Sequence, residues 1–454
     1  MYGMPLSQAL VFVVAVVIII VATQWRHFHP FLVLVVVASA FGYIAGDPTS
    51  QLGSLFGSGF GEKIYSPGLA IVAASLIAGL AETTAASDRL MAQTDRWRWL
   101  GSNWIAASLG LIAGLAAAPA AAFALLTPLL RPIGGDTPQN RQSTTVALGL
   151  AISASHGLLL LSPVPIAAVA ILGADWKRVA LLGLPLAIFL VAFGALFAVW
   201  SSSIDAAAEP LPAAPHPAEE KQSGGSAIVL LLAAAIPLLL LIVQSLGDIP
   251  NEPLGGGPAR ELVVGIGRPL ILFLAGVGIM LIGHLRRGLE LFANPDWIGR
   301  VFGNVSSILL IVCAAGGLQS LCQQTGMAEM VGDRLLGWDG VGVLGVLVPF
   351  LIAATIKTLQ GSSLVAAITS AGMVQPILLP LGLASANRTA LAALAVGAGA
   401  MTICHVNDDY FWLVANKAGL SPLRAITTVG VGTLLQGLIV AAVLLILAVL
   451  MSHA

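Results

Sequence analysis

The stretch TICHVNDDYFW, residues 402–412, places an imidazole, an amide and two carboxylates close together in otherwise apolar sequence. Shortly before it, residues 391–400 are all Ala, Leu, Val or Gly. In a water-soluble protein such a polar cluster would lie in a solvent-facing loop. Whether this chain offers such a loop, or instead buries the cluster in a membrane, decides its fold.

The composition favours the membrane. The chain has 454 residues, of which 58% are hydrophobic and only 9% charged, whereas soluble domains carry roughly a quarter charged residues. Its mean hydropathy is +0.96. Several apolar runs approach the roughly 20 residues that cross about 30 Å of hydrocarbon, namely residues 10–22, 31–44, 179–199, 228–243 and 434–450. We expect an all-α polytopic membrane protein with about 12–14 membrane segments, because only helices and closed barrels span bilayers and the alternating barrel pattern is absent.

The charge balance limits the partners. A net charge of −1 gives no basic surface for nucleic acid. The three cysteines lie in apolar context without the spacing of a metal site, so we expect buried free thiols and neither a metal nor a cofactor. Membrane lipid is the expected surrounding, in a multi-pass protein of the cytoplasmic (inner) membrane.

A polar linker divides the chain into two halves. Residues 201–226 collect prolines, acidic residues, Ser and Gly, which is typical of a solvent-exposed linker. We therefore expect one repeat over residues 1–200 and a second over residues 227–454. Each half contains an interrupted apolar stretch with a histidine, and paired interruptions of this kind indicate a transporter site near the membrane midplane.

In the first half, the glycine-rich residues 53–61 lack the ending of a phosphate loop and are expected to form an entrance loop. Glu82 ends an apolar run, so it is either interfacial or a buried functional carboxylate. Further on, Ser153, Ser155 and His156 precede the prolines of the stretch SPVP, residues 162–165. This pattern predicts a broken helix, whose freed backbone groups require protein or a water-filled cavity.

In the second half, Lys357 lies between apolar runs, where a lysine costs about 2.5–3.5 kcal/mol on insertion scales. It either reaches a nearby interface or attracts an anion together with the helix start at Gly361, Ser362 and Ser363, because helix N-termini bind carboxylates. The hydroxyls of Thr358 and the two serines either donate to a substrate or cap a helix. We expect a re-entrant hairpin with this polar tip.

Four groups are candidates for proton coupling. His156 and His405 titrate near neutral pH, although a structural histidine bonded to a carbonyl is an equal alternative for each. Asp408 and its neighbour Asp409 cannot share one helical face, and we favour Asp408 as the buried carboxylate. Glu82 is the fourth candidate. We expect Asn407 and Asp408 to bind the substrate, together with Ser153, Ser155, His156 and His405.

The chain resembles the gluconate permease family of proton-coupled sugar-acid transporters. The most specific match is HVND followed by FWLV within residues 397–414. Three further stretches resemble the family, namely residues 155–168, 316–326 and 353–362. Within them, Val164 replaces a Gly of the family, and Lys357 stands where the family tends to have Arg. Near Ala120 many relatives carry a Glu that is missing here, which leaves the coupling ion and the substrate open.

The resemblance implies the ion transporter superfamily fold, with two inverted repeats that each contain a re-entrant hairpin and a broken helix. It also implies a homodimer and an elevator-type movement. The expected function is proton-coupled uptake of gluconate or a related sugar acid or hydroxy acid, with sodium as an alternative coupling ion. The partner would be a small carboxylate substrate.

Two other function classes stay open at this point. A sodium-coupled dicarboxylate or D-amino acid transporter is one, although a single buried cation, Lys357, is few for two carboxylates. An intramembrane hydrolase is the other, and it would need Glu82 to face Asp408. The paired interruptions favour a transporter over an enzyme.

Overall fold

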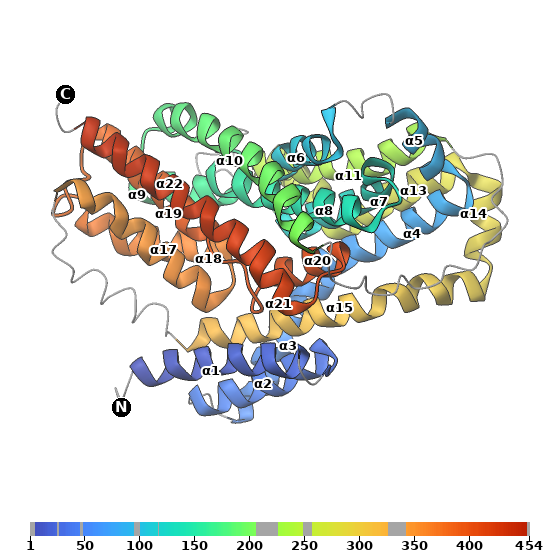
Figure 1. Cartoon of the computed structure of the whole chain (residues 1–454), viewed down its shortest axis with the longest axis horizontal. Coiled ribbons are helices and arrows are strands. Elements are labelled where there is room, and N and C mark those ends of the chain that lie inside the picture. The colour runs from blue at the N-terminus through green and yellow to red at the C-terminus, as the bar shows by residue number, and fades with distance from the viewer. Residues whose placement is uncertain are drawn as a thin grey trace.

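The computed structural model describes residues 5–24, 27–45, 49–94, 100–116, 118–205, 226–247, 257–325 and 342–451, and within these ranges it is helical with no strand (Figure 1). The expected all-helical class is confirmed. Most of the predicted linker, residues 206–225, lies outside the described residues, while its first residues continue a helix to Asp205. The division into 1–200 and 227–454, and the inverted repeat, stay predictions.

The elements before the linker are α1 (Pro5–Gln24), α2 (Pro30–Ala45), α3 (Thr49–Lys63), the π-helical turn η1 (Ile64–Gly68), α4 (Leu69–Thr83), α5 (Ala86–Thr94), α6 (Ser102–Ala113), α7 (Pro119–Gly134), α8 (Pro138–Leu158), α9 (Pro163–Leu172) and α10 (Trp176–Asp205). Many of them begin at a proline, whose fixed φ suits the first helical position and whose missing N–H is not needed there.

The elements after the linker are α11 (Ala227–Gly247), α12 (Pro258–Ile266), α13 (Pro269–Gly283), α14 (Leu285–Phe292), α15 (Pro295–Gln324), η3 (Gly342–Val346), α17 (Leu347–Gln360), α18 (Ser363–Val374), η4 (Gln375–Ile377), α19 (Ala386–Met401), α20 (Asp409–Ala418), α21 (Pro422–Ala425), η5 (Ile426–Gly430) and α22 (Val431–Leu450).

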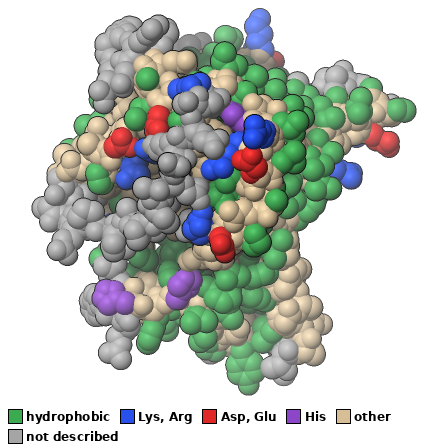
Figure 2. Space-filling view, turned by 90° about the vertical axis from the view of Figure 1, so that its right-hand side faces the viewer, with side chains coloured by type: hydrophobic (Ala, Val, Ile, Leu, Met, Phe, Trp, Pro, Cys, Tyr) green, Lys and Arg blue, Asp and Glu red, His purple; other side chains and the backbone are tan. Residues whose placement is uncertain are grey.

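Membrane-length helices are present in both halves. Among the described residues six helices are long and apolar enough to cross a membrane, or seven if the bent pair α12–α13 counts as one, and six apolar helices are shorter. Large apolar side chains point outward, for example Leu181, Leu184 and Ile188 on α10. Figure 2 shows apolar side chains over wide areas of one face, with charged side chains scattered over its upper and middle parts. Such a surface suits contact with lipid.

The glycine-rich residues 53–61 do not form the expected entrance loop. They lie inside α3, which packs along the long helix α15. The two helices approach closely because glycines face each other: a Cβ at Gly59 would overlap the carbonyl oxygen of Gly316. Close packing of small residues therefore outweighs the low helix propensity of glycine.

Helices α8 and α19 form the buried centre of the molecule. Every residue of α19 from Thr389 to Met401 is buried, and α8 is buried over nearly all of its second half. They cross where a Cβ at Gly397 would overlap the carbonyl oxygen of Gly157. Both helices end shortly after this crossing, so their ends are held side by side.

The interruptions predicted from the sequence are present. Helix α8 ends at Leu158 and α9 begins at Pro163, and proline restricts the preceding Ser162 to an extended conformation. Helix α19 ends at Met401, and residues 402–408 lead to α20. Helices α17 and α18 are joined by a turn at Gly361 and pack against each other. The polar residues of these three interruptions surround one cavity.

Candidate functional site

A cavity of about 190 Å³ lies among these interruptions. Its walls come from both halves of the chain, so it exists only when the two are packed together. Among the described residues its lining is Glu62, Lys63, Ser66, Pro67, Ala118, Pro119, Ala120, Ser153, His156, Gly157, Gln319, Lys357, Gly361, Ser362, Ser363, Leu364, Met401, Cys404, Asp408, Asp409 and Tyr410.

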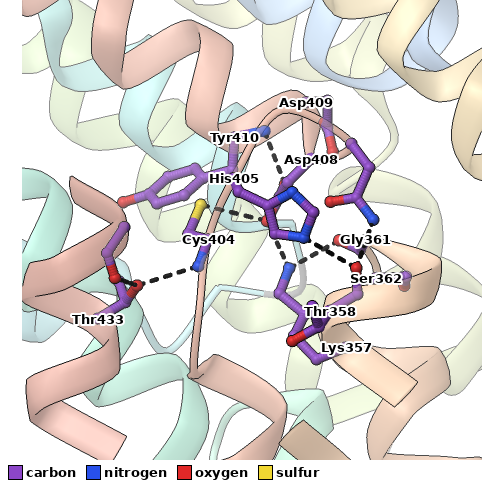
Figure 3. Close-up of polar contacts among 12 residues, drawn as sticks. Lys357, Thr358, Gly361, Ser362, Cys404, His405, Asp408, Asp409, Tyr410 and Thr433 are labelled. Atoms are coloured by element: carbon purple, nitrogen blue, oxygen red, sulfur yellow. Dashed lines mark hydrogen bonds and ion pairs between the residues drawn. The ribbon is translucent and has the colours of Figure 1, made fainter. Parts of the chain in front are cut away.

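The centre of the site is an ion pair between Lys357 and Asp408, both less than 5% exposed. The Nζ of Lys357 donates to the carboxylate of Asp408 and, at 2.7 Å, to the carbonyl oxygen of Gly361 (Figure 3). Lys357 therefore does not reach out to an interface but stays inside the protein. A buried lysine needs such partners, since an unpaired charge away from water is costly.

Asp408 is held by three kinds of donor. Besides Lys357, the backbone N–H of Tyr410 donates to its Oδ1 at 2.9 Å, which caps α20, and the Sγ of Cys404 lies 3.3 Å from its Oδ2. The backbone N–H of Cys404 in turn donates to Oγ1 of Thr433 on α22 at 3.0 Å. These contacts fix the position of the carboxylate at the cavity wall.

The hairpin tip presents a helix N-terminus to the same cavity. Gly361 has φ +75°, a left-handed conformation that ends α17, and a Cβ there would overlap the carbonyl oxygen of Asn407. Ser362 caps α18, because its Oγ accepts a 3.4 Å hydrogen bond from the N–H of Val365. The first N–H groups of a helix have no partner within it. Lys357 and the start of α18 together favour an anion.

The first interruption contributes Ser153 and His156 to the cavity wall. The Nδ1 of His156 lies 2.9 Å from Oγ of Ser162 and 3.3 Å from the carbonyl oxygen of Gly114, so this ring is fixed by neighbouring loops. Ser155 does not line the cavity. Its buried hydroxyl donates to the carbonyl oxygen of Gly110 on α6 at 3.1 Å, and thereby joins α8 to α6.

His405, Asn407 and Thr358 lie beside the cavity rather than on its wall. The Nε2 of His405 and the Nδ2 of Asn407 both bond the carbonyl oxygen of Thr358, at 2.8 and 2.9 Å. The hydroxyl of Thr358 donates to the carbonyl oxygen of Ala354 within α17. The second interruption is thus tied to the end of α17. Within the described chain, Nδ1 of His405 and Oδ1 of Asn407 are buried without a hydrogen-bond partner.

Glu82 lies apart from this group of residues. It is half-buried in the last turn of α4 and is not among the described residues that line the cavity. Asp408 faces Lys357, not a second carboxylate from α4. The arrangement that a hydrolase with Asp408 and Glu82 would need is therefore not formed.

The sequence interpretation missed a second ion pair in the cavity. The Nζ of Lys63, at the end of α3, lies 3.4 Å from Oδ1 of Asp409, with side chains 15% and 11% exposed. Gln319 on α15 also lines this wall, and its Oε1 is buried with no partner among the described residues. Lys63 and Glu62 interrupt an apolar region, which is a detectable signal, but the neighbouring glycines suggested a loop.

The chain also matches a known sequence family over nearly its whole length. The profile of the GntP family permeases covers residues 4–451. The chain belongs to the GntP permease family. It is thus a multi-pass membrane protein of a transporter family and not an enzyme family, and the cytoplasmic membrane fits its bacterial relatives.

Curated relatives of this GntP permease are similar over nearly the whole chain. The gluconate permease of Pseudomonas aeruginosa is 27% identical, with 93% of each chain covered. The low-affinity gluconate transporter of Escherichia coli is 24% identical, covering 93% of this chain and 94% of the relative. The D-serine transporter DsdX of Escherichia coli is also 24% identical, covering 89% and 90%. The family thus includes proteins named for chemically different substrates.

Two solved transporter structures are distantly similar to the GntP permease chain. MtrF of Neisseria gonorrhoeae has a TM-score of 0.33 and 14% identity, covering 97% of this chain and 95% of its own. The YdaH transporter of Alcanivorax borkumensis has a TM-score of 0.38 and 17% identity, covering 97% of both. Both scores lie below 0.5, so neither supports a conclusion about this chain.

Proposed function

We propose that this GntP permease is a secondary active transporter that takes up gluconate or a related sugar acid together with protons. The observation that carries the proposal is the buried Lys357 at the hairpin tip, whose ammonium group lines the cavity next to the start of α18. An ammonium group and a helix N-terminus at one wall form a site for a carboxylate. The names of the gluconate relatives support the same substrate class.

Proton coupling would act through the pair of Lys357 and Asp408. A substrate carboxylate that binds Lys357 takes the place of the Asp408 carboxylate. Asp408 is only 4% exposed, and a buried carboxylate without a cation is costly in its charged form. Asp408 therefore takes up a proton when substrate binds and gives it up when substrate leaves, which links the two movements.

The remaining predicted roles separate by position. Ser153, Ser362 and Ser363 line the cavity and are the proposed partners of substrate hydroxyls. Ser155 and Thr358 donate to backbone carbonyls and hold the walls in place. His156 is proposed to contact substrate, and as a second candidate to carry the proton.

The other neighbours of the cavity have proposed supporting roles. His405 and Asn407 position the tip of the hairpin through the carbonyl oxygen of Thr358. The elevator-type movement and the homodimer remain parts of the proposal, and they rest on the family resemblance.

The test is uptake into proteoliposomes under an imposed pH gradient. Labelled gluconate should accumulate when the gradient is present and should stop accumulating when a protonophore is added. Lys357→Met should abolish accumulation, whereas Lys177→Gln, at an exposed lysine near the start of α10, should not change it. If accumulation requires sodium and a protonophore does not affect it, the coupling ion is sodium and not the proton.

D-Serine is a second candidate substrate, because one relative is a D-serine transporter. The carboxylates of Asp408 and Asp409 at the cavity wall could accept an ammonium group while Lys357 binds the amino acid carboxylate. Competition decides between the two: an excess of unlabelled D-serine should leave gluconate uptake unchanged if the site is built for sugar acids.

A further inference from the structure

We propose that Lys63 is a specificity-determining residue that binds a second acidic group of the substrate, so that the preferred substrate is a sugar acid with a carboxylate at each end. The inference rests on the proposed function, since it concerns the same cavity. Lys63 and Lys357 both line this cavity, and they come from different halves of the chain. Among the described residues, Lys357, the buried cation that the sequence indicated, therefore shares the cavity wall with the half-buried Lys63.

Lys63 is held in place by the packing of α3 on α15. A Cβ at Gly316 would overlap Cγ of Lys63, so the lysine stem passes across the glycine of α15 on its way to the cavity. Any side chain larger than glycine at position 316 would block the path of the Lys63 side chain. The close helix packing therefore carries a charged group inward, where a lysine on a lipid-facing helix would instead reach the membrane surface.

The two lysines are held by consecutive carboxylates. Lys357 pairs with Asp408, and Lys63 pairs with Asp409 at 3.4 Å. The Cα atoms of neighbouring residues are about 3.8 Å apart, so both ammonium groups are anchored at one end of α20. A substrate with two carboxylates can replace both aspartates, one at each lysine, whereas a monocarboxylate can replace only one.

The charges of the cavity determine how many cations must accompany a substrate with two carboxylates. Three carboxylates, from Glu62, Asp408 and Asp409, face two lysines in the lining. Glu62 is 74% exposed and 3.9 Å from Lys63, so it is largely screened by solvent. The buried part of the site is therefore balanced, and a dianion enters only if Asp408 and Asp409 are both neutralised by cations that accompany it.

Gln319 adds a neutral partner at the same wall. Its Oε1 is buried and accepts no hydrogen bond from the described residues. A buried acceptor without a donor is unfavourable, and a substrate hydroxyl beside the second carboxylate would supply that donor. The position of Gln319 on α15, the helix that carries Gly316, places it with Lys63.

Gluconate and glucarate provide a matched pair of probes, because they differ only at C6, which is an alcohol in one and a carboxylate in the other. Their affinities for the purified protein in detergent are measured by calorimetry at one pH, and their uptake is measured in proteoliposomes. The wild type should bind glucarate at least about tenfold more tightly, as expected for a hydrogen bond to a charged group. In Lys63→Gln the ratio of the two affinities should fall to about one, and Lys63→Arg should restore part of it.

Two control variants test whether a lost preference for glucarate comes from an unpaired Asp409 or from the removal of any lysine. Lys63→Gln leaves Asp409 buried without its cation, so the double variant Lys63→Gln/Asp409→Asn removes both charges and should fold while still lacking the glucarate preference. Lys177→Gln removes an exposed lysine and should keep the wild-type ratio. A purely structural ion pair would lower thermal stability in Lys63→Gln and leave the ratio unchanged, which would overturn the inference.

The outcomes separate this inference from the proposed function. Uptake of gluconate without preference for glucarate would refute the role of Lys63 and leave the proposed function intact. Uptake of glucarate without gluconate would support the role of Lys63 and refute gluconate as a substrate. Binding of neither acid would refute both.

Discussion

Removing either member of the pair Lys357 and Asp408 should destabilise the protein, and the loss should be larger for Asp408. In Asp408→Asn, the buried ammonium group keeps the carbonyl oxygen of Gly361 as a partner but loses its carboxylate, and removing one member of a buried pair costs about 3–5 kcal/mol. The cap of α20 survives, since Asn replaces Asp well at that position. Lys357→Met should cost less, because Asp408 keeps the N–H of Tyr410 and the thiol of Cys404.

The thermal shift follows from the size of the chain. Unfolding entropy is about 2.1 cal/mol/K per residue near 60 °C, so for 454 residues one degree corresponds to about 1 kcal/mol. Asp408→Asn should therefore lower the melting temperature of the detergent-purified protein by about 3–5 °C. The double variant Lys357→Met/Asp408→Asn should melt above Asp408→Asn, because no unpaired charge remains.

A surface pair provides the control for this cycle. Arg286 and Glu290 are 3.5 Å apart, with side chains 96% and 48% exposed, and such pairs contribute about 0–1 kcal/mol. Glu290→Gln should therefore shift the melting temperature by about 1 °C or less. Additive losses in the double variant, equal to the sum of the two single variants, would refute the coupling between Lys357 and Asp408.

Three further outcomes can be checked with the same protein. Gly361→Ala should lower the melting temperature by more than about 1–2 °C, because the left-handed conformation alone costs alanine about 1–2 kcal/mol and the new methyl group would also overlap the carbonyl oxygen of Asn407. Gly397→Ala should destabilise the crossing with Gly157 by about 1–3 kcal/mol through overpacking, while Gly372→Ala, where no atom lies within 4 Å of the new methyl group, should not lower the melting temperature. Glu82→Gln should keep gluconate uptake within about twofold of wild type, because this carboxylate lies outside the cavity and would contribute no general acid–base step there.

The interruptions of the helices could be predicted because their causes are local. Pro163 and Gly361 end or begin helices through their own backbone geometry, and the polar residues of 402–412 are visible against apolar sequence. Lys357 could be singled out for the same reason, since a lone lysine in an apolar run is costly wherever it lies. These signals also gave the lining residues Ser153, His156, Ser362 and Asp408.

The partners of these residues could not be predicted from local signals. Lys63 pairs with Asp409 from the other half of the chain. Residues 53–61 form a helix instead of the expected loop, because Gly59 packs closely on Gly316. The sequence favours Asp408 over Asp409 as the buried carboxylate, whereas the structure buries both and pairs each with a lysine. Tertiary contacts between distant segments decide such features, and no local pattern in a single sequence reports them.

The distance along the chain between Lys63 and Asp409 has a consequence for synthesis. About 350 residues separate them, which takes roughly 20–70 s to translate at 5–20 residues per second. During this interval α3 and α15 can already be in the membrane while Lys63 still lacks the carboxylate that it meets in the finished protein. Glu62, 3.9 Å away, is the neighbour able to neutralise it until α20 arrives. The adjacent Glu62 would thus neutralise the charge of Lys63 until Asp409 is synthesised. In the finished protein Asp409 takes over this role, and Glu62 is left exposed at the cavity.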